Sequence, residues 1–339
     1  MLAQQRGLSH SQVSVIRRRY ADLPAGKKTL HSAIYDSPAS GATPIVFLHG
    51  MSPLGISDPR QVRAVQALVH AGFRVICPEI PAIRNLHIEA GSITVFIAVL
   101  KNILADTKLA PAGKIALFAP SFSGAICLKA AAEAGLADKI SAVCAMGSLA
   151  GIRGSMEYLF LSAEADAYAR FIVLANYLPL VKKYAPLGRV FSAMAHDNWS
   201  ENAAENPLMP GIRKTSYTQE ALRKLKPAQH KQAERLRDDS TFRAEVFAEL
   251  SPFMEKEITA YDVLSVAAKI AAPVFLLHGA DDNVIPTQES VQLAGRLHKN
   301  RLVISPFVGH GDSKVSISRI PDVFRLINGF AWYFKQIGA

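Results

Sequence analysis

The sequence predicts an α/β fold with a doubly wound, mostly parallel sheet and an inserted all-helical segment. Short apolar runs alternate with amphipathic segments over most of the chain, which is typical of strand–helix–strand units with a sheet covered on both faces. The alternation stops between residues 150 and 265, where the pattern is helical. Between residues 114 and 130, one apolar run turns abruptly into an alanine-rich helical segment through a proline and several small residues.

The composition indicates a chain that can bury a large core without metal ions or disulfides. Its 339 residues are 50% hydrophobic, which fits one domain with an insertion, or two domains. The three cysteines lie singly in apolar runs without CxxC spacing, and we expect buried free thiols at Cys77, Cys127 and Cys144. No dinucleotide fingerprint or metal-ligand spacing is present, so we expect no cofactor and no metal.

The net charge of +10 is unevenly distributed. Residues 1–30 hold six basic side chains against Asp22 alone, which accounts for half of the excess. No basic groove with interleaved aromatic residues follows, which argues against nucleic acid as the main partner. For the N-terminal arm with Arg17, Arg18 and Arg19 we expect at most weak contact with an anionic membrane surface. The chain lacks an apolar run near the ~18 residues of a membrane span and a signal-peptide pattern, so we expect a cytoplasmic protein.

The first part of the chain, residues 1–149, is expected to form most of the sheet. Residues 11–36 alternate loosely, which predicts an antiparallel hairpin at the sheet edge with Pro24 and Gly26 in its turn. The elements expected after it are a strand at 44–48, a helix from Pro59 to His70 capped by Asp58, a strand at 73–77, a helix at 93–105 and a strand at 140–146.

The helical segment, residues 150–265, separates this part from a shorter second part, residues 266–339. Within the segment we expect an apolar helical stretch at 156–184, a polar loop at 196–216, and helices at 219–226, 227–236 and 242–250. After it we expect strands at 273–277 and 301–304 and a terminal helix from Pro321 to Phe334.

The strand-to-helix turn at Ser121 carries the first candidate for chemistry. Small residues stand two before it and two and three after it, at Ala119, Ser123 and Gly124. Larger side chains there would collide in a tight, strained turn, and such a turn lifts a hydroxyl towards the free N–H groups of a helix N-terminus. A shift by two residues would place Ser123 at the turn instead and Ile126 at the second small position, so Ser121 is the preferred candidate.

This turn resembles the nucleophile elbow of the α/β-hydrolase fold family, with Ala119 and Ser123 where glycines usually stand. Further similarities are a strand followed by His49-Gly50-Met51, a G-x-x-D-x-x-I-P run from Gly279 to Pro286, and Gly309-His310 after the last strand. The resemblance covers residues 40–149 and 266–335. It implies that the helical segment is the cap of such a hydrolase.

The resemblance also implies roles for individual residues. Ser121 would be the nucleophile, Asp282 the triad acid and His310 the base, in the family's chain order. Asp281 is the alternative acid. The backbone N–H groups of Met51 and Phe122 would form the oxyanion hole, and His49 would be structural.

These roles predict a serine hydrolase that cleaves a carboxylic ester or thioester with an apolar acyl or alcohol group through an acyl-enzyme. The partner would be a small-molecule acyl substrate. The same triad also serves C–C bond hydrolases, amide hydrolases and acyltransferases. An alternative of another class is a non-catalytic protein of this fold that binds a hydrophobic ligand or a partner. The sequence assigns neither the subfamily nor the oligomeric state.

Overall fold

An eight-stranded sheet with the order β1-β2-β4-β3-β5-β6-β7-β8 forms the centre of the molecule. The computed structural model describes residues 16–36, 40–308 and 320–338. The strands are β1 (Arg17–Ala25), β2 (Lys28–Asp36), β3 (Ile45–Phe47), β4 (Val75–Pro78), β5 (Ile115–Pro120), β6 (Ile140–Met146), β7 (Val274–Gly279) and β8 (Asn300–Ser305). The pairs β1–β2 and β2–β4 are antiparallel and the other pairs are parallel, which confirms the predicted mostly parallel sheet.

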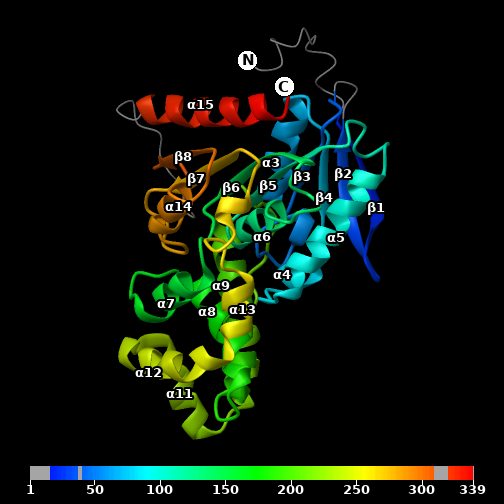
Figure 1. Cartoon of the computed structure of the whole chain (residues 1–339). Coiled ribbons are helices and arrows are strands. Elements are labelled where there is room, and N and C mark those ends of the chain that lie inside the picture. The colour runs from blue at the N-terminus through cyan, green and yellow to red at the C-terminus, as the bar shows by residue number, and fades with distance from the viewer. Residues whose placement is uncertain (1–15, 37–39, 309–319, 339) are drawn as a thin grey trace.

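Helices cover both faces of the sheet. Those outside the 150–265 segment are α3 (Pro59–His70), α4 (Pro81–Arg84), α5 (Gly91–Ala105), α6 (Phe122–Ala131), α14 (Thr287–Ala294) and α15 (Ile320–Gln336). Residues of α3 and α15 bury their apolar sides in one core cluster, and residues of α5, α6 and α14 bury theirs in another. The predicted doubly wound arrangement is therefore present, with α15 lying across one end of the molecule (Figure 1).

The N-terminal hairpin forms at the sheet edge as expected, within the described residues 16–36. Pro24 lies in β1 opposite Thr29 and not in the turn, which corrects the expectation. An edge strand tolerates proline because the N–H that proline lacks is not needed for pairing on the open side. The turn itself uses Gly26, which has a φ of +67°. The basic run begins β1, and its Arg18 guanidinium lies over the rings of Tyr20 and Tyr35.

Seven α-helices follow between β6 and β7 and lie together at one end of the sheet (Figure 1). They are α7 (Ile152–Leu161), α8 (Ala167–Tyr177), α9 (Ala185–Glu205), α10 (Tyr217–Arg223), α11 (Pro227–Asp238), α12 (Ser240–Leu250) and α13 (Glu255–Ala260). We call residues 150–265 the helical insertion. It contains no strand, all of its residues being described.

The predicted polar loop at 196–216 is wrong in its first half, because α9 continues to Glu205. Polar residues there bond to one another and to the next helix instead of breaking α9. The Asp197 carboxylate accepts hydrogen bonds from the backbone N–H groups of Tyr217 and Thr218, at 2.9 and 2.8 Å, and so caps α10. The Ser200 hydroxyl bonds to the Asp197 carbonyl at 2.9 Å. The polar residues that suggested a loop here are therefore residues whose side chains form hydrogen bonds within the insertion.

The three cysteines are buried and free, as predicted. Burial raises the pKa of the Cys77 thiol to about 12, so it is protonated and unreactive at neutral pH. Within the described ranges, no helix is both long and apolar enough to cross a membrane. No cluster of three His, Cys, Asp or Glu side chains in that part of the chain is arranged to hold a metal ion.

Candidate active site

The turn between β5 and α6 is strained at Ser121. This residue has φ +55° and ψ −138°, a conformation that residues other than glycine rarely adopt. Its N–H donates to the Met146 carbonyl at 2.6 Å, and its carbonyl accepts from the Gly124 N–H at 2.8 Å. Ser123 is fully buried, and its hydroxyl donates to the His49 carbonyl. The strained turn thus lies at Ser121 and not at Ser123.

Gly124 explains why the elbow needs small residues. A Cβ atom at this position would lie 2.6 Å from the Ser148 Oγ and 3.4 Å from the Ala145 Cβ. The first turn of α6 therefore packs directly against the end of β6 and the residues after it. This close approach holds the partly exposed Ser121 at the carboxyl edge of the sheet.

The loop after β3 lies beside this elbow. Strands β3 and β5 are parallel neighbours, and the Leu48 N–H donates to the Phe118 carbonyl. The chain therefore places Met51 next to the start of α6, where Phe122 is the first helical residue. Among the hydrogen bonds of the described residues, neither the Met51 nor the Phe122 backbone N–H has an acceptor. Both are available as donors, and their role as an oxyanion hole stays a prediction.

His49 holds the peptide that precedes Met51. Its Nδ1 lies 2.9 Å from the Gly50 carbonyl oxygen, and its Nε2 accepts from the Ile80 N–H at 3.1 Å. These partners assign a neutral imidazole with its proton on Nδ1. Burial lowers the pKa of His49 and so favours this neutral form. The contacts agree with the structural role expected for this residue.

Two carboxylates that the sequence did not single out for the site also hold this loop. The Ser52 hydroxyl donates to Asp58 at 2.7 Å, and Arg60 donates to the same carboxylate. Burial opposes ionisation of Asp58, but the hydrogen bonds and charge of Arg60 outweigh it and lower the pKa of that carboxyl. The Glu79 carboxylate accepts from the Ile56 N–H at 3.2 Å. Of these contacts, the sequence indicated only that Asp58 caps a helix, through the Asp58-Pro59 pattern.

Asp282 lies in the loop after β7 with a side chain only 5% exposed. Its Oδ1 accepts from the N–H groups of Val284 and Ile285, at 2.9 and 3.0 Å. Asp281 is exposed, so the structure separates the two acidic candidates by burial. The assignment of Asp282 as triad acid remains a prediction that its geometry supports.

Ser121 and Asp282 approach the same point at the end of β6. Ser121 bonds to the Met146 carbonyl, and the next residue, Gly147, would place a Cβ atom 3.2 Å from the Asp282 Oδ2. Gly147 itself has a φ of +55° and donates its N–H to the Leu277 carbonyl of β7. Neighbouring parallel strands thus place the two predicted residues, which are far apart in the sequence, at the same edge of the sheet on either side of the end of β6.

A second histidine, His278, lies 3.5 Å from Asp282, but both of its ring nitrogens are within hydrogen-bond distance of other groups. Its Nε2 lies 2.8 Å from the Ile285 carbonyl oxygen, and its Nδ1 lies 2.6 Å from the Ser290 hydroxyl. The side chain is completely buried. His278 therefore stabilises the loop after β7 that carries Asp282, here called the acid loop. Neither of its nitrogens is free to serve as a base.

The predicted base, His310, lies outside the described residues. The strand that precedes it in the sequence, β8, pairs with β7 so that its last residue, Ser305, is opposite Gly279. Both strands are parallel and end at the edge that carries Ser121 and Asp282. The role of His310 stays a prediction.

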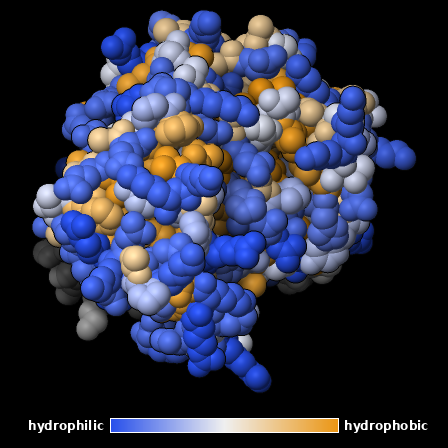
Figure 2. Space-filling model, turned by 90° about the horizontal axis from the view of Figure 1, so that it is seen from below, coloured by the Kyte–Doolittle hydropathy of each residue, from blue (hydrophilic) through white to orange (hydrophobic). Residues whose placement is uncertain are grey.

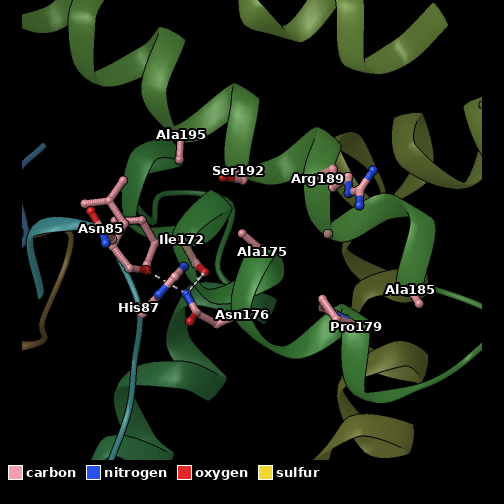
Figure 3. A pocket seen from close by; sticks show the side chains of 12 residues that line it. Asn85, His87, Ile172, Ala175, Asn176, Pro179, Ala185, Arg189, Ser192 and Ala195 are labelled. Carbon is pink, nitrogen blue, oxygen red and sulfur yellow. Dashed lines mark hydrogen bonds between the residues drawn. The ribbon is translucent and has the colours of Figure 1, made fainter. Parts of the chain in front are cut away.

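A pocket of about 280 Å³ lies elsewhere, between α8, α9 and the residues after α4 (Figure 3). None of the predicted site residues lines it. At its edge the Asn176 side chain accepts from the Ile88 N–H and donates to the carbonyls of Leu86 and Ile172, all at 2.8 to 2.9 Å. This pocket marks a junction between the insertion and the rest of the fold, and not the candidate active site.

Comparison with protein families supplies the family. The model described as the alpha/beta hydrolase fold matches residues 43–314. The chain belongs to the alpha/beta hydrolase fold family. The match spans the elbow, the helical insertion and the acid loop. No curated protein matches the sequence.

Solved structures share the fold of this hydrolase-family chain at low sequence identity. The 2-hydroxy-6-oxo-6-phenylhexa-2,4-dienoate hydrolase of Rhodococcus sp. strain RHA1 is 16% identical with a TM-score of 0.54, over 95% of this chain and 100% of that one. A membrane phospholipase A, described as a bacterial virulence factor, is 15% identical with a TM-score of 0.51, over 99% and 91%. The acylaminoacyl peptidase of Pyrococcus horikoshii is 13% identical with a TM-score of 0.53, over 97% and 43%. These similarities establish the fold alone.

Proposed function

We propose that this protein is a serine hydrolase that cleaves a carboxylic ester or thioester through an acyl-enzyme. The observation that carries the proposal is the strained turn at Ser121, a partly exposed residue that directly precedes Phe122. Among the described residues, the backbone N–H groups of Phe122 and Met51 have no acceptor. A strained turn costs stability and persists where it serves a purpose, which makes Ser121 the nucleophile in our proposal.

In the proposed reaction, His310 takes the Ser121 proton while Ser121 Oγ attacks the acyl carbon. The Met51 and Phe122 N–H groups donate to the oxygen that becomes negative, and such donors are worth about 3 to 4 kcal/mol each in related chemistry. His310 then passes the proton to the leaving group, which departs and leaves the acyl-enzyme. Water releases the acyl group by the same steps in reverse, and Asp282 orients His310 and stabilises its charged form.

Apolar and aromatic groups around the elbow support an apolar substrate. The Phe122 ring packs against the Tyr261 ring with centroids 4.7 Å apart, and Met51 and Tyr168 are partly buried nearby in the same core cluster. Figure 2, which views the molecule from below, shows apolar side chains exposed in hollows between hydrophilic ones on that face. We therefore propose an apolar acyl or alcohol group, with residues 150–265 acting as a cap over the site.

The proposal is tested by turnover of p-nitrophenyl esters of increasing chain length and of an acyl thioester. Replacing the nucleophile by Ser121→Ala should lower kcat by at least about 10⁴-fold without unfolding the protein. The matched variant Ser123→Ala should retain turnover, because Ser123 only bonds to the His49 carbonyl. Full activity in Ser121→Ala would refute the mechanism. If the protein cleaved only an amide or a C–C bond substrate, the proposed triad would stand and the proposed ester or thioester substrate would be wrong.

A further inference from the structure

Met51 is held by side chains on both of its peptide planes. On the preceding plane, the Gly50 carbonyl oxygen accepts from His49 at 2.9 Å. The Gly50 carbonyl and the Met51 N–H belong to one planar trans peptide and point in opposite directions. By fixing the carbonyl, His49 therefore also fixes the direction of the Met51 N–H.

The following peptide plane is held from the helical insertion. The Tyr168 hydroxyl, on the first turn of α8, donates to the Met51 carbonyl at 3.2 Å. Only the two backbone dihedral angles of Met51 join the two planes. With a hydrogen bond from His49 on one plane and from Tyr168 on the other, the range of both angles is restricted.

The same helical turn also contacts the acid loop. The Asp166 N–H donates to the Asn283 carbonyl at 2.9 Å, and Asn283 directly follows Asp282. The Asp166 carboxylate caps α8 by accepting from the Ala169 N–H at 2.8 Å. One turn of α8 therefore bridges the loop that carries Met51 and the loop that carries Asp282.

The environment of Tyr168 suits a constant hydrogen-bond donor. Burial raises the pKa of this tyrosine well above its usual value, so its hydroxyl keeps its proton at neutral pH. Arg60, Asp58 and Asp166 are the charged groups that act on it. The Arg60 and Asp58 side chains are bonded to each other.

We propose that Tyr168 is a positioning residue, which orients the Met51 peptide for oxyanion binding when α8 of the insertion is seated on the core. Its role in the reaction rests on the proposed function, because it concerns the same oxyanion hole. The contact of the hydroxyl is with the Met51 carbonyl, so its role is to orient the donor. It makes the geometry of the hole depend on the position of the insertion.

Tyr168→Phe removes the hydroxyl and leaves the ring in place. We expect kcat for a p-nitrophenyl ester to fall about 3- to 10-fold, the effect of one ordinary hydrogen bond, with KM changed less than twofold. Tyr184→Phe is the matched control, since the Tyr184 hydroxyl bonds to Glu249 within the insertion at 3.3 Å. Tyr184→Phe should leave kcat and KM for the same ester unchanged.

A second measurement does not require activity. Protein labelled with ¹⁵N at methionine gives few amide signals, because the chain has seven methionines, and Met51→Leu identifies the Met51 signal. Tyr168→Phe should shift or broaden that signal, and Tyr184→Phe should not. If wild-type protein shows no turnover but this difference is seen, the proposed function fails while the positioning role stands.

Three results would overturn the inference. One is an unchanged kcat together with an unchanged Met51 signal in Tyr168→Phe. Another is a rise in KM at constant kcat, which would mean that Tyr168 binds the substrate uniformly and does not orient the oxyanion donor. The third is an equal loss in both tyrosine variants, which would indicate a general loosening of the insertion.

Discussion

The two loops that follow β3 and β7, here called the core loops, and the helical insertion both bury polar side chains against backbone groups, but with different consequences. In the core loops, His49 and Asp282 bond to the peptides of segments that carry the candidate site. In the insertion, the buried guanidinium groups of Arg170 and Arg243 donate to the carbonyls of Leu159 and Phe160, at the end of α7. The first kind of contact sets the geometry of a site, and the second joins helices to one another. Substitutions should therefore separate activity from stability.

The largest effect is expected at the acid loop. Asp282→Asn keeps an oxygen for the Val284 and Ile285 N–H groups but loses the negative charge on Oδ2. Since triads that lose this charge lose about 10⁴-fold in kcat, we expect a loss of that order in ester turnover with little change in unfolding free energy. Asp281→Asn, at the exposed neighbour, should stay near wild-type activity. Equal losses in both variants would contradict the assignment of Asp282.

The buried guanidinium groups within the insertion should respond in the opposite way. Arg243 is 2% exposed and donates to the carbonyls of Phe160, Leu236 and Arg237. Arg243→Met leaves these buried acceptors without a donor, so the unfolding free energy from urea titration should fall by about 1 to 3 kcal/mol. The activity of the remaining folded protein should be close to wild type.

A matched surface change sharpens this second prediction. Arg237 pairs with Asp238 at 2.7 Å but is half exposed, and Arg237→Met should change the unfolding free energy by no more than about 0.5 kcal/mol. If Arg243→Met lowers kcat tenfold at unchanged stability, the distinction between contacts that set the site and contacts that join helices of the insertion is wrong.

The last expected effect is a pH dependence of stability that originates at His49, in the loop after β3. Burial lowers the pKa of His49, so the folded protein resists protonation there while the unfolded chain protonates near pH 6.5. Below that pH the unfolded state binds more protons at this residue, and the unfolding free energy falls by at most about 1.4 kcal/mol per pH unit. Urea titrations at pH 7.5 and 5.5 should show a smaller fall in His49→Gln than in wild type. An equal fall in both would exclude His49 as the source.

Local packing explains what the sequence could predict. The elbow at Ser121 was predictable because Gly124 must be small to pack against Ser148, and such a requirement is visible within a few residues. The helix cap at Asp58 followed from its neighbour Pro59 in the same way. The sheet followed from apolar runs of strand length, and the family match agrees with it.

Contacts between distant segments explain what the sequence could not predict. Nothing near Tyr168 indicates that its hydroxyl meets the Met51 carbonyl, 117 residues earlier in the chain. Glu289 likewise accepts from the N–H groups of Ala150 and Gly151 at the start of the insertion. The sequence around Glu289 has no feature that would distinguish it from an ordinary surface helix. Such pairings depend on the tertiary fold, which local propensity does not encode.

The central claim, that Ser121 is an activated nucleophile, is tested most directly by a fluorophosphonate probe. Purified protein would be labelled, digested and analysed by mass spectrometry, alongside Ser121→Ala and Ser123→Ala. We predict a single modification on Ser121, absent in Ser121→Ala and present in Ser123→Ala. A modification on Ser123, or none in folded wild-type protein with the probe in excess, would contradict the account.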